Sequence, residues 1–165
     1  MKLRKLKEKD AFRMLEWMHY EESKDIFEKD FCNKTIDDVL KFINNERGNE
    51  IHYACVDEND NYLGTVSLKN IDTNNLNAEL AISFLREAQG TGAASFAMNE
   101  IVNIGFNKLG LYKLYLNVLS TNIRAIKFYI KFGFKKEGIF KNHIKKGDNF
   151  IDLEWYGIYR DYYKL

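Results

Sequence analysis

Residues 78–110 read AELAISFLREAQGTGAASFAMNEIVNIGFNKLG and carry three local signals in direct succession. Residues 78–85 form a mostly apolar run of strand length, which predicts a β-strand. Gly90 and Gly92 follow, and an apolar pattern at helical spacing begins directly after them. Gly110 is predicted to end this helix, because glycine readily adopts the left-handed conformation required there. The stretch therefore predicts a strand, a glycine-rich loop and a helix.

The loop containing Gly90 and Gly92 is a candidate anion site. Glycine has no Cβ, so the backbone there turns tightly and approaches a ligand closely. The following helix directs its unpaired N–H groups and positive dipole end at the loop, an arrangement suited to a pyrophosphate. A lone pair of glycines more commonly just joins a strand to a helix. The segment lacks the lysine of a P-loop and the third glycine of a dinucleotide-binding fingerprint.

A second signal lies about thirty residues further along the chain, around Asn122 and Tyr129. Asn122 is suited to cap a helix over residues 122–132, and Gly133 is suited to end it. Ala125 and Tyr129 lie four positions apart and therefore on one face. A phenol on that face can donate a proton to a leaving thiolate if it points into a cleft. By itself, Tyr129 is more commonly a core aromatic residue, since the chain has 10 tyrosines.

Together the two signals resemble the Gcn5-related N-acetyltransferase superfamily. Residues 89–93, Gln-Gly-Thr-Gly-Ala, are similar to its acetyl-CoA pyrophosphate loop. Its second cofactor motif is similar to the set Asn122, Ala125, Tyr129, Gly133 and Phe134. The likeness covers nearly the whole chain. The opening residues 3–17 and the closing residues 152–156 resemble the branch that contains ribosomal-protein N-terminal, spermidine and amino-sugar acetyltransferases.

The resemblance implies a single α/β domain over residues 1–165, with a central mixed β-sheet flanked by helices. Two neighbouring parallel strands, residues 78–85 and 114–118, would splay apart around the pantetheine arm of acetyl-CoA, the implied co-substrate. Backbone amides near residues 82–85 would polarise the thioester carbonyl. The implied cofactor-binding residues are Ile82, Phe84, Leu85, Gln89, Gly90, Thr91, Gly92, Ala93, Ala94, Asn117 and Asn122.

The resemblance also implies an activity and two catalytic residues. Tyr129 is the expected general acid, and Glu79 is the candidate base that removes a proton from the acceptor amine. Such assistance typically contributes ~10²–10⁴ in rate. For Glu79, a role as substrate anchor or as a solvated edge carboxylate stays open. We expect direct attack by a primary amine in a ternary complex. The amine is left open among a protein N-terminus, a polyamine and an amino sugar, and the alternative is a non-catalytic acyl-CoA-binding module.

The chain departs from the family pattern in one charge. The pyrophosphate loop often carries Gln or Arg three positions before its first glycine, and Glu87 stands there in this chain. A carboxylate would repel phosphate unless it turns outward, so Arg86 or Gln89 is expected to supply the donor. The connection from Glu79 to Gly90 is also short.

The remaining segments predict a strand, two helices and two further strands before the glycine loop, and two strands after the last helix. Asp10 is expected to cap the first helix. Thr35 and Asp38 form a capping box for the second, which Gly48 is expected to end. The predicted strands cover residues 3–6, 51–56, 62–68, 134–139 and 150–159, with a polar loop between the last two.

Composition excludes several classes of protein. The net charge is +1, which gives no broad electrostatic footprint for nucleic acid. No apolar run approaches the ~20 residues of a membrane span, and the first residues have no signal-peptide pattern, so the expected location is the cytoplasm. Two isolated cysteines and three scattered histidines indicate neither disulfides nor a metal site. The resemblance places the acidic stretch Glu21, Glu22, Asp25, Glu28 and Asp30 in the acceptor wall, where it would attract a cationic amine. A run of charges is more commonly a solvated face, which is the favoured interpretation. A homodimer is conceivable from aromatic residues near the C-terminus.

Overall fold

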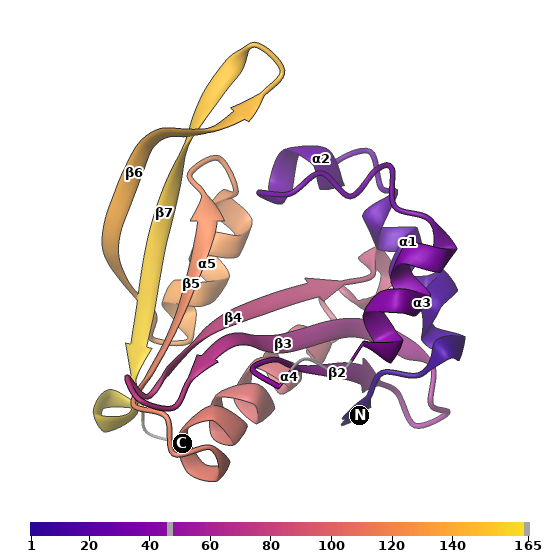
Figure 1. Ribbon diagram of the computed structural model, residues 1–165, viewed down its shortest axis with the longest axis horizontal. Helices are drawn as coiled ribbons and strands as arrows, with labels where there is room; N and C mark the ends of the chain where they lie inside the picture. The colour runs from indigo at the N-terminus through magenta and orange to yellow at the C-terminus, as the bar shows by residue number, and fades with distance from the viewer. Residues whose placement is uncertain (46–47, 164–165) are drawn as a thin grey trace.

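The computed structural model describes residues 1–45 and 48–163, which form one seven-stranded mixed β-sheet flanked by helices (Figure 1). The strand order is β1-β2-β3-β4-β5-β7-β6, and only β4 and β5 pair in parallel. The strands are β1 (Lys2–Lys5), β2 (Ile51–Val56), β3 (Tyr62–Asp72), β4 (Asn77–Phe84), β5 (Lys113–Leu119), β6 (Lys135–Lys146) and β7 (Asn149–Tyr159).

The helices divide between the two faces of this sheet. They are α1 (Ala11–Met18), α2 (Ser23–Ile26), α3 (Ile36–Asn44), α4 (Ala93–Asn103), which continues as a π turn over Ile104–Lys108, and α5 (Ile123–Lys131). In Figure 1, α1 and α3 lie above β2 and β3, while α4 crosses beneath them. Short 3₁₀ turns flank these elements at Glu8–Asp10, Arg86–Ala88 and Arg160–Tyr162.

Helix α4 packs closely on the sheet because its buried face carries small and flexible side chains. Ala93, Ala97, Met98 and Ile101 are all fully buried, at the three- and four-residue spacing of one helix face. Gly105 continues that contact, since a Cβ there would lie 3.1 Å from the side chain of Leu114. This packing fixes the position of α4 relative to the sheet, and with it the position of the glycine loop between β4 and α4.

Strands β4 and β5 pair only at their first residues and then separate. Their register runs from Asn77 opposite Lys113 to Glu79 opposite Tyr115, and no later pair is formed although both strands continue. Figure 1 shows the two strands opening from this point, with β5 turning toward the β6–β7 hairpin. The predicted splayed pair of parallel strands is confirmed.

Most predicted elements occur within one or two residues of their expected bounds, and the capping box of Thr35 and Asp38 is confirmed. The predicted polar loop after residue 139 is wrong. Strand β6 instead continues to Lys146, because its polar side chains lie on an exposed edge strand where alternation with apolar residues is not required. Gly147, at φ 59°, makes the turn into β7.

Two predicted helix ends also differ. Asp10 does not cap α1, because its carboxylate accepts hydrogen bonds from Arg4 at 2.7 Å and from the Lys7 amide at 2.9 Å. Helix α3 ends at Asn44, four residues before Gly48, and residues 46 and 47 lie outside the described part of the chain. In contrast, Gly110 and Gly133 have the expected positive φ, at 69° and 92°.

Candidate active site

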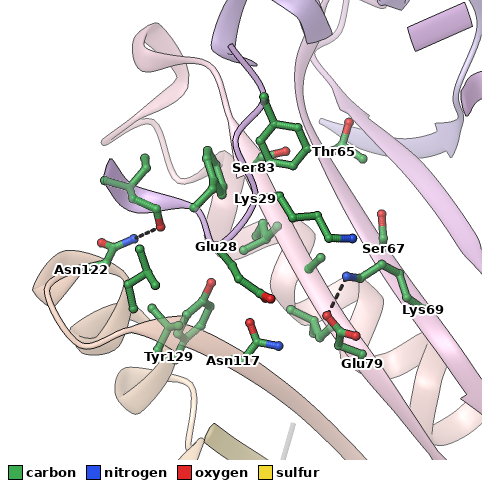
Figure 2. Close-up of a pocket in the computed structure, with 18 of the residues that line it drawn as sticks. Glu28, Lys29, Thr65, Ser67, Lys69, Glu79, Ser83, Asn117, Asn122 and Tyr129 are labelled. Carbon is green, nitrogen blue, oxygen red and sulfur yellow. Dashed lines mark hydrogen bonds and ion pairs between the residues drawn. The ribbon is translucent and has the colours of Figure 1, made fainter. Parts of the chain in front are cut away.

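The opening between β4 and β5 contains a cavity of about 180 Å³, shown in Figure 2. Its walls come from β3, β4, β5, α5 and the segment that follows α2. Polar side chains face it from all of these elements: Glu28, Lys29, Thr65, Ser67, Lys69, Glu79, Ser83, Asn117, Asn122 and Tyr129. The fold therefore brings both predicted catalytic residues to one cavity.

Tyr129 reaches the cavity from α5 as an uncharged phenol. Its side chain is 9% exposed, and in Figure 2 its hydroxyl points into the cavity. That hydroxyl makes no hydrogen bond to any residue within the described ranges. Burial raises the pKa of Tyr129 to about 12, because the phenolate would lose its hydration. The group therefore keeps its proton at neutral pH and is able to donate it.

Glu79 lies at the last residue pair that joins β4 to β5. Its carboxylate accepts a hydrogen bond from the ammonium of Lys69 at 2.6 Å (Figure 2). It accepts another from the side-chain amide of Asn70 at 2.9 Å. Lys69 stands opposite Glu79 in the β3–β4 register, so the pair is a direct cross-strand contact. The predicted base is in the cavity, but both of its oxygens already have partners.

The free backbone amides of β4 are those of alternate residues. The Leu85 amide donates to the carbonyl of Leu63 at 2.9 Å, so it faces β3 and is not available to a ligand. Because N–H groups alternate in direction along a strand, the amides of Ile82 and Phe84 face the open side toward β5. The expectation that Leu85 donates to a pantetheine arm is therefore wrong, whereas Ile82 and Phe84 have the required orientation.

The glycine loop lies outside the cavity, at the start of α4. Gly90 and Gly92 have φ values of 80° and 87°, in the left-handed region that favours glycine. Thr91 organises the loop, because its hydroxyl donates to the Ala88 carbonyl at 2.7 Å and accepts from the Ala93 amide at 3.3 Å. Ala93 is fully buried, so its side chain packs in the core and is not available to a ligand.

Charged side chains around this loop are arranged differently from the sequence expectation. Glu87 forms an ion pair with Arg13 of α1, which also pairs with Glu16. Arg86, an expected phosphate donor, is bound instead to Glu22 at 2.6 Å. The side chain of Gln89 accepts a hydrogen bond from Arg124, in the first turn of α5. Arg124 therefore places a guanidinium beside the loop. It was not among the phosphate donors expected from the sequence.

The two asparagines of the predicted cofactor site have different surroundings. Asn122 caps α5 by accepting from the Ala125 amide at 3.2 Å, and its amide group donates to the Ile26 carbonyl at 3.3 Å. Its side chain therefore holds α5 and α2 together. Asn117 points into the cavity from β5 and has no side-chain hydrogen bond to the residues that the structure describes (Figure 2). Of the two, Asn117 is the one available to a ligand.

The acidic segment over residues 21–30 contributes residues to one wall of the cavity. Glu28 and Lys29 line the cavity. Lys146, at the tip of the β6–β7 hairpin, donates to the carbonyls of Phe27 at 2.7 Å and Glu28 at 3.3 Å, which fixes the segment across the opening. Glu28 is exposed, as the interpretation of the stretch as a solvated face predicts, and it also lines the cavity.

The cysteines and histidines do not form an alternative centre in the described residues. Cys55 is fully buried, and this burial raises the pKa of its thiol to about 11. The Asp30 carboxylate raises the pKa of Cys32. Both effects disfavour the thiolate that an acyl carrier needs. His143 lies on β6 against Phe140 and is not a cavity residue. Within residues 1–45 and 48–163, no helix is long and apolar enough to cross a membrane.

Splayed parallel strands with a glycine loop at the start of the next helix define the class of fold: an N-acetyltransferase-like α/β domain. Residues 3–155 match the model of the acetyltransferase (GNAT) domain family. The chain belongs to this family.

The chain is also similar to individual N-acetyltransferases, some of them spermidine acetyltransferases. Over 75 residues, 46% of this chain and 40% of the relative, the chain is 43% identical to the spermidine N(1)-acetyltransferase of Escherichia coli (strain K12). The chain spans about half the length of the curated relatives it matches.

Solved structures of a Vibrio cholerae enzyme show the same fold. The crystal structure of its spermidine N-acetyltransferase in complex with CoA and spermine has a TM-score of 0.89 at 23% identity, covering 97% of this chain and 95% of that one. A dodecameric structure of that enzyme has a TM-score of 0.77 at 23% identity, covering 97% and 94%.

Proposed function

We propose that this protein is an acetyl-CoA-dependent N-acetyltransferase that acts on a cationic primary amine. The observation that carries the proposal is the position of Tyr129, a buried phenol whose hydroxyl points into the cavity where β4 and β5 separate. A non-catalytic acyl-CoA-binding module would not need a proton donor there.

In the proposed reaction, acetyl-CoA supplies an acetyl thioester, and the chain orients it and moves protons. The amides of Ile82 and Phe84 donate to the pantetheine arm and the thioester carbonyl, which stabilises the charge that develops on that oxygen. The amine nitrogen attacks the carbonyl carbon, and the carbon–sulfur bond breaks. Tyr129 donates its proton to the departing sulfur, which leaves as a thiol.

The glycine loop is the proposed site of the diphosphate. Gly90 and Gly92 leave the backbone open to a close approach, and α4 directs its positive end at the loop. Arg124 contributes a guanidinium beside Gln89, while the ion pair with Arg13 offsets part of the charge of Glu87, the residue that would otherwise repel the phosphates. This arrangement explains how the loop binds an anion despite its departure from the family pattern.

The acceptor is proposed to be a polyamine or a similar diamine. Glu28 and Glu79 place two carboxylates on the cavity wall, and carboxylates attract ammonium groups. The spermidine acetyltransferases to which the chain is similar support the same class of amine. Glu79 is proposed mainly as a charged anchor for the amine, since Lys69 and Asn70 already occupy its oxygens.

The proposal extends to the whole chain and its assembly. Residues 1–165 act as one catalytic domain located in the cytoplasm. Phe140 and Phe150 of the β6–β7 hairpin are 48% and 59% exposed, which favours an association of copies through this hairpin. The dodecameric neighbour supports an oligomer, either the expected homodimer or a larger assembly.

Titration with acetyl-CoA tests the proposed function, with ATP and NAD as controls. Acetyl-CoA at 100 times its Kd should stabilise the folded chain by about 2.7 kcal/mol, measured as a thermal shift. Release of free thiol should then follow on addition of spermidine, and should be slower with glucosamine or an N-terminal peptide. Equal stabilisation by all three nucleotides, or no thiol release with any amine, would contradict the proposal.

A further inference from the structure

Three hydrogen-bonded side chains, those of Ser67, His52 and Glu50, lead from the cavity wall toward the outside of the sheet. His52 on β2 stands directly opposite Ser67 on β3, so both side chains lie on the cavity face of the sheet. The Nδ1 atom of His52 lies 2.7 Å from the hydroxyl of Ser67. Its Nε2 atom lies 3.2 Å from a carboxylate oxygen of Glu50, which directly precedes β2.

The chemistry of Glu50 determines the direction of these hydrogen bonds. An ionised carboxylate only accepts, so the proton of a neutral His52 is on Nε2. Nδ1 is then an acceptor, and the hydroxyl of Ser67 donates to it. The lone pairs of the Ser67 oxygen are left to face the cavity, where they accept a hydrogen bond from an amine N–H. Because Ser67 donates to His52, a proton taken up by the Ser67 oxygen from the cavity can be passed outward to the imidazole.

The surroundings of His52 favour a proton path over a purely structural contact. The ring of Phe42 packs against the imidazole at a centroid distance of 4.5 Å and holds its orientation. Ser67 is 5% exposed and lines the cavity, whereas His52 and Glu50 line a second depression near the start of β2. The three side chains therefore connect two separate solvent-accessible spaces.

A second cavity hydroxyl, that of Thr65, is hydrogen-bonded to a phenol and not to an imidazole. Thr65 also lines the cavity, and its hydroxyl lies 2.7 Å from that of Tyr62. The Tyr62 hydroxyl accepts from the indole N–H of Trp17 at 3.2 Å. Burial raises the pKa of Tyr62 well above its usual value, so this hydroxyl stays protonated. Of these two series of hydrogen-bonded side chains, the one that begins at Ser67 ends in an imidazole and a carboxylate.

The proposed reaction has a proton that needs such a path. A primary ammonium carries three N–H bonds and the amide product carries one, so two protons leave the nitrogen. The CoA sulfur gains one proton, through Tyr129. The second must leave the cavity, and Glu79 is already bound to Lys69 and Asn70.

We propose that Ser67, His52 and Glu50 form the relay that takes this second proton from the acceptor amine to the outer depression. The inference rests on the proposed function. The Ser67 oxygen accepts a proton from the amine nitrogen, directly or through one water, while its own proton passes to Nδ1 of His52. The imidazolium that results is stabilised by Glu50 and loses a proton to solvent on the outer side. The proton lost is the one on Nε2, so the ring is left protonated on Nδ1. Exchange with solvent water returns that proton to Nε2 and the Ser67 hydroxyl rotates back toward Nδ1, which restores the starting state; no bond between heavy atoms changes.

Steady-state thiol release with acetyl-CoA and spermidine tests the relay in the full-length protein. Ser67→Ala should lower kcat by about 100-fold and leave the acetyl-CoA Kd within twofold, because the hydroxyl assists only proton removal. Ser67→Thr, which keeps a hydroxyl, should recover most of the activity. His52→Ala should lower kcat similarly and be partly rescued by added imidazole. His143→Gln, at an exposed histidine outside the cavity, is the matched control. The double variant Ser67→Ala/His52→Ala should be no slower than the worse single variant.

Outcomes against the relay are distinct from failure of the proposed function. A Ser67→Ala protein within threefold of wild-type kcat would overturn the relay, as would single losses that multiply in the double variant. If His52→Ala does not fold, the Ser67 variants decide alone. NMR of the wild-type imidazole nitrogens gives an independent check, because a protonated Nδ1 in the neutral ring would also overturn the relay. A wild-type chain that binds acetyl-CoA but acetylates no amine would instead contradict the proposed function, and the relay with it.

Discussion

The Lys69 ammonium donates to the Glu79 carboxylate at 2.6 Å, across the last paired residues before β4 and β5 separate. The pair is partly buried, with side-chain exposures of 28% and 17%. The ion pair balances one negative and one positive charge at the base of the cavity. Because both oxygens of Glu79 are already hydrogen-bonded, Glu79 is better suited to anchor a cation than to remove its proton.

Glu79→Gln keeps the shape of the side chain and removes its charge. The Lys69 ammonium then faces the cavity without a counter-charge and repels a cationic amine. We expect the KM for spermidine to rise about tenfold, equivalent to ~1.4 kcal/mol, with kcat within threefold of wild type. Initial-rate kinetics check this. A large fall in kcat at unchanged KM would instead assign Glu79 the role of general base.

Tyr129→Phe removes the proposed proton donor while keeping the ring in the core. We expect kcat to fall by about 100-fold, with the acetyl-CoA Kd unchanged within twofold, because the hydroxyl acts on the leaving sulfur only in the transition state. Calorimetric titration and thiol release measure the two quantities. Unchanged turnover would remove Tyr129 from the mechanism.

The buried phenol of Tyr129 also predicts an alkaline loss of stability. Its pKa is raised from 10 to about 12 in the folded state, so the folded chain retains a proton that the unfolded chain loses first. Its stabilising contribution is complete below pH 10 and is lost as the pH rises from 10 to 12, by about 3 kcal/mol. Urea unfolding at each pH measures the slope. Tyr129→Phe should reduce this slope but not abolish it, because the pKa values of Tyr62, Tyr156 and Tyr159 are raised as well. Tyr162→Phe, at a side chain 73% exposed, should leave it unchanged.

Gly92→Val places a branched side chain at φ 87° and into the approach of the diphosphate. The backbone strain should cost about 1–2 kcal/mol of unfolding free energy, and the acetyl-CoA Kd should rise more than tenfold. Gly138→Ala is the control, since its backbone is not left-handed and a Cβ there has no neighbour within 4 Å. Retention of full affinity by Gly92→Val would place the diphosphate elsewhere.

Arg124→Gln should weaken acetyl-CoA binding by about fivefold, the loss expected for one solvent-exposed charge contact of ~1 kcal/mol. The difference from wild type should shrink as salt is added, because screening weakens the contact. Arg160→Gln, at an exposed arginine distant from the loop, should bind as wild type. Equal salt dependence of wild type and Arg124→Gln would exclude Arg124 from the phosphate site.

Local patterns in the sequence determined the fold and most of the candidate cofactor site. The left-handed turns at Gly90 and Gly92, the cap at Asn122 and the end of α5 at Gly133 depend on neighbours only a few residues away, so spacing alone predicts them. The length of β6 was not predictable in this way, because a polar edge strand has no buried face and therefore no apolar alternation.

Tertiary structure alone decided which side chains meet. The contact of His52 with Ser67 and that of Lys69 with Glu79 depend on the register of antiparallel strands, and a shift of one residue would turn those side chains to the other face. The pairs of Glu87 with Arg13 and of Gln89 with Arg124 join elements that are distant in sequence. Such contacts arise only once the sheet and helices have packed, so no local pattern encodes them.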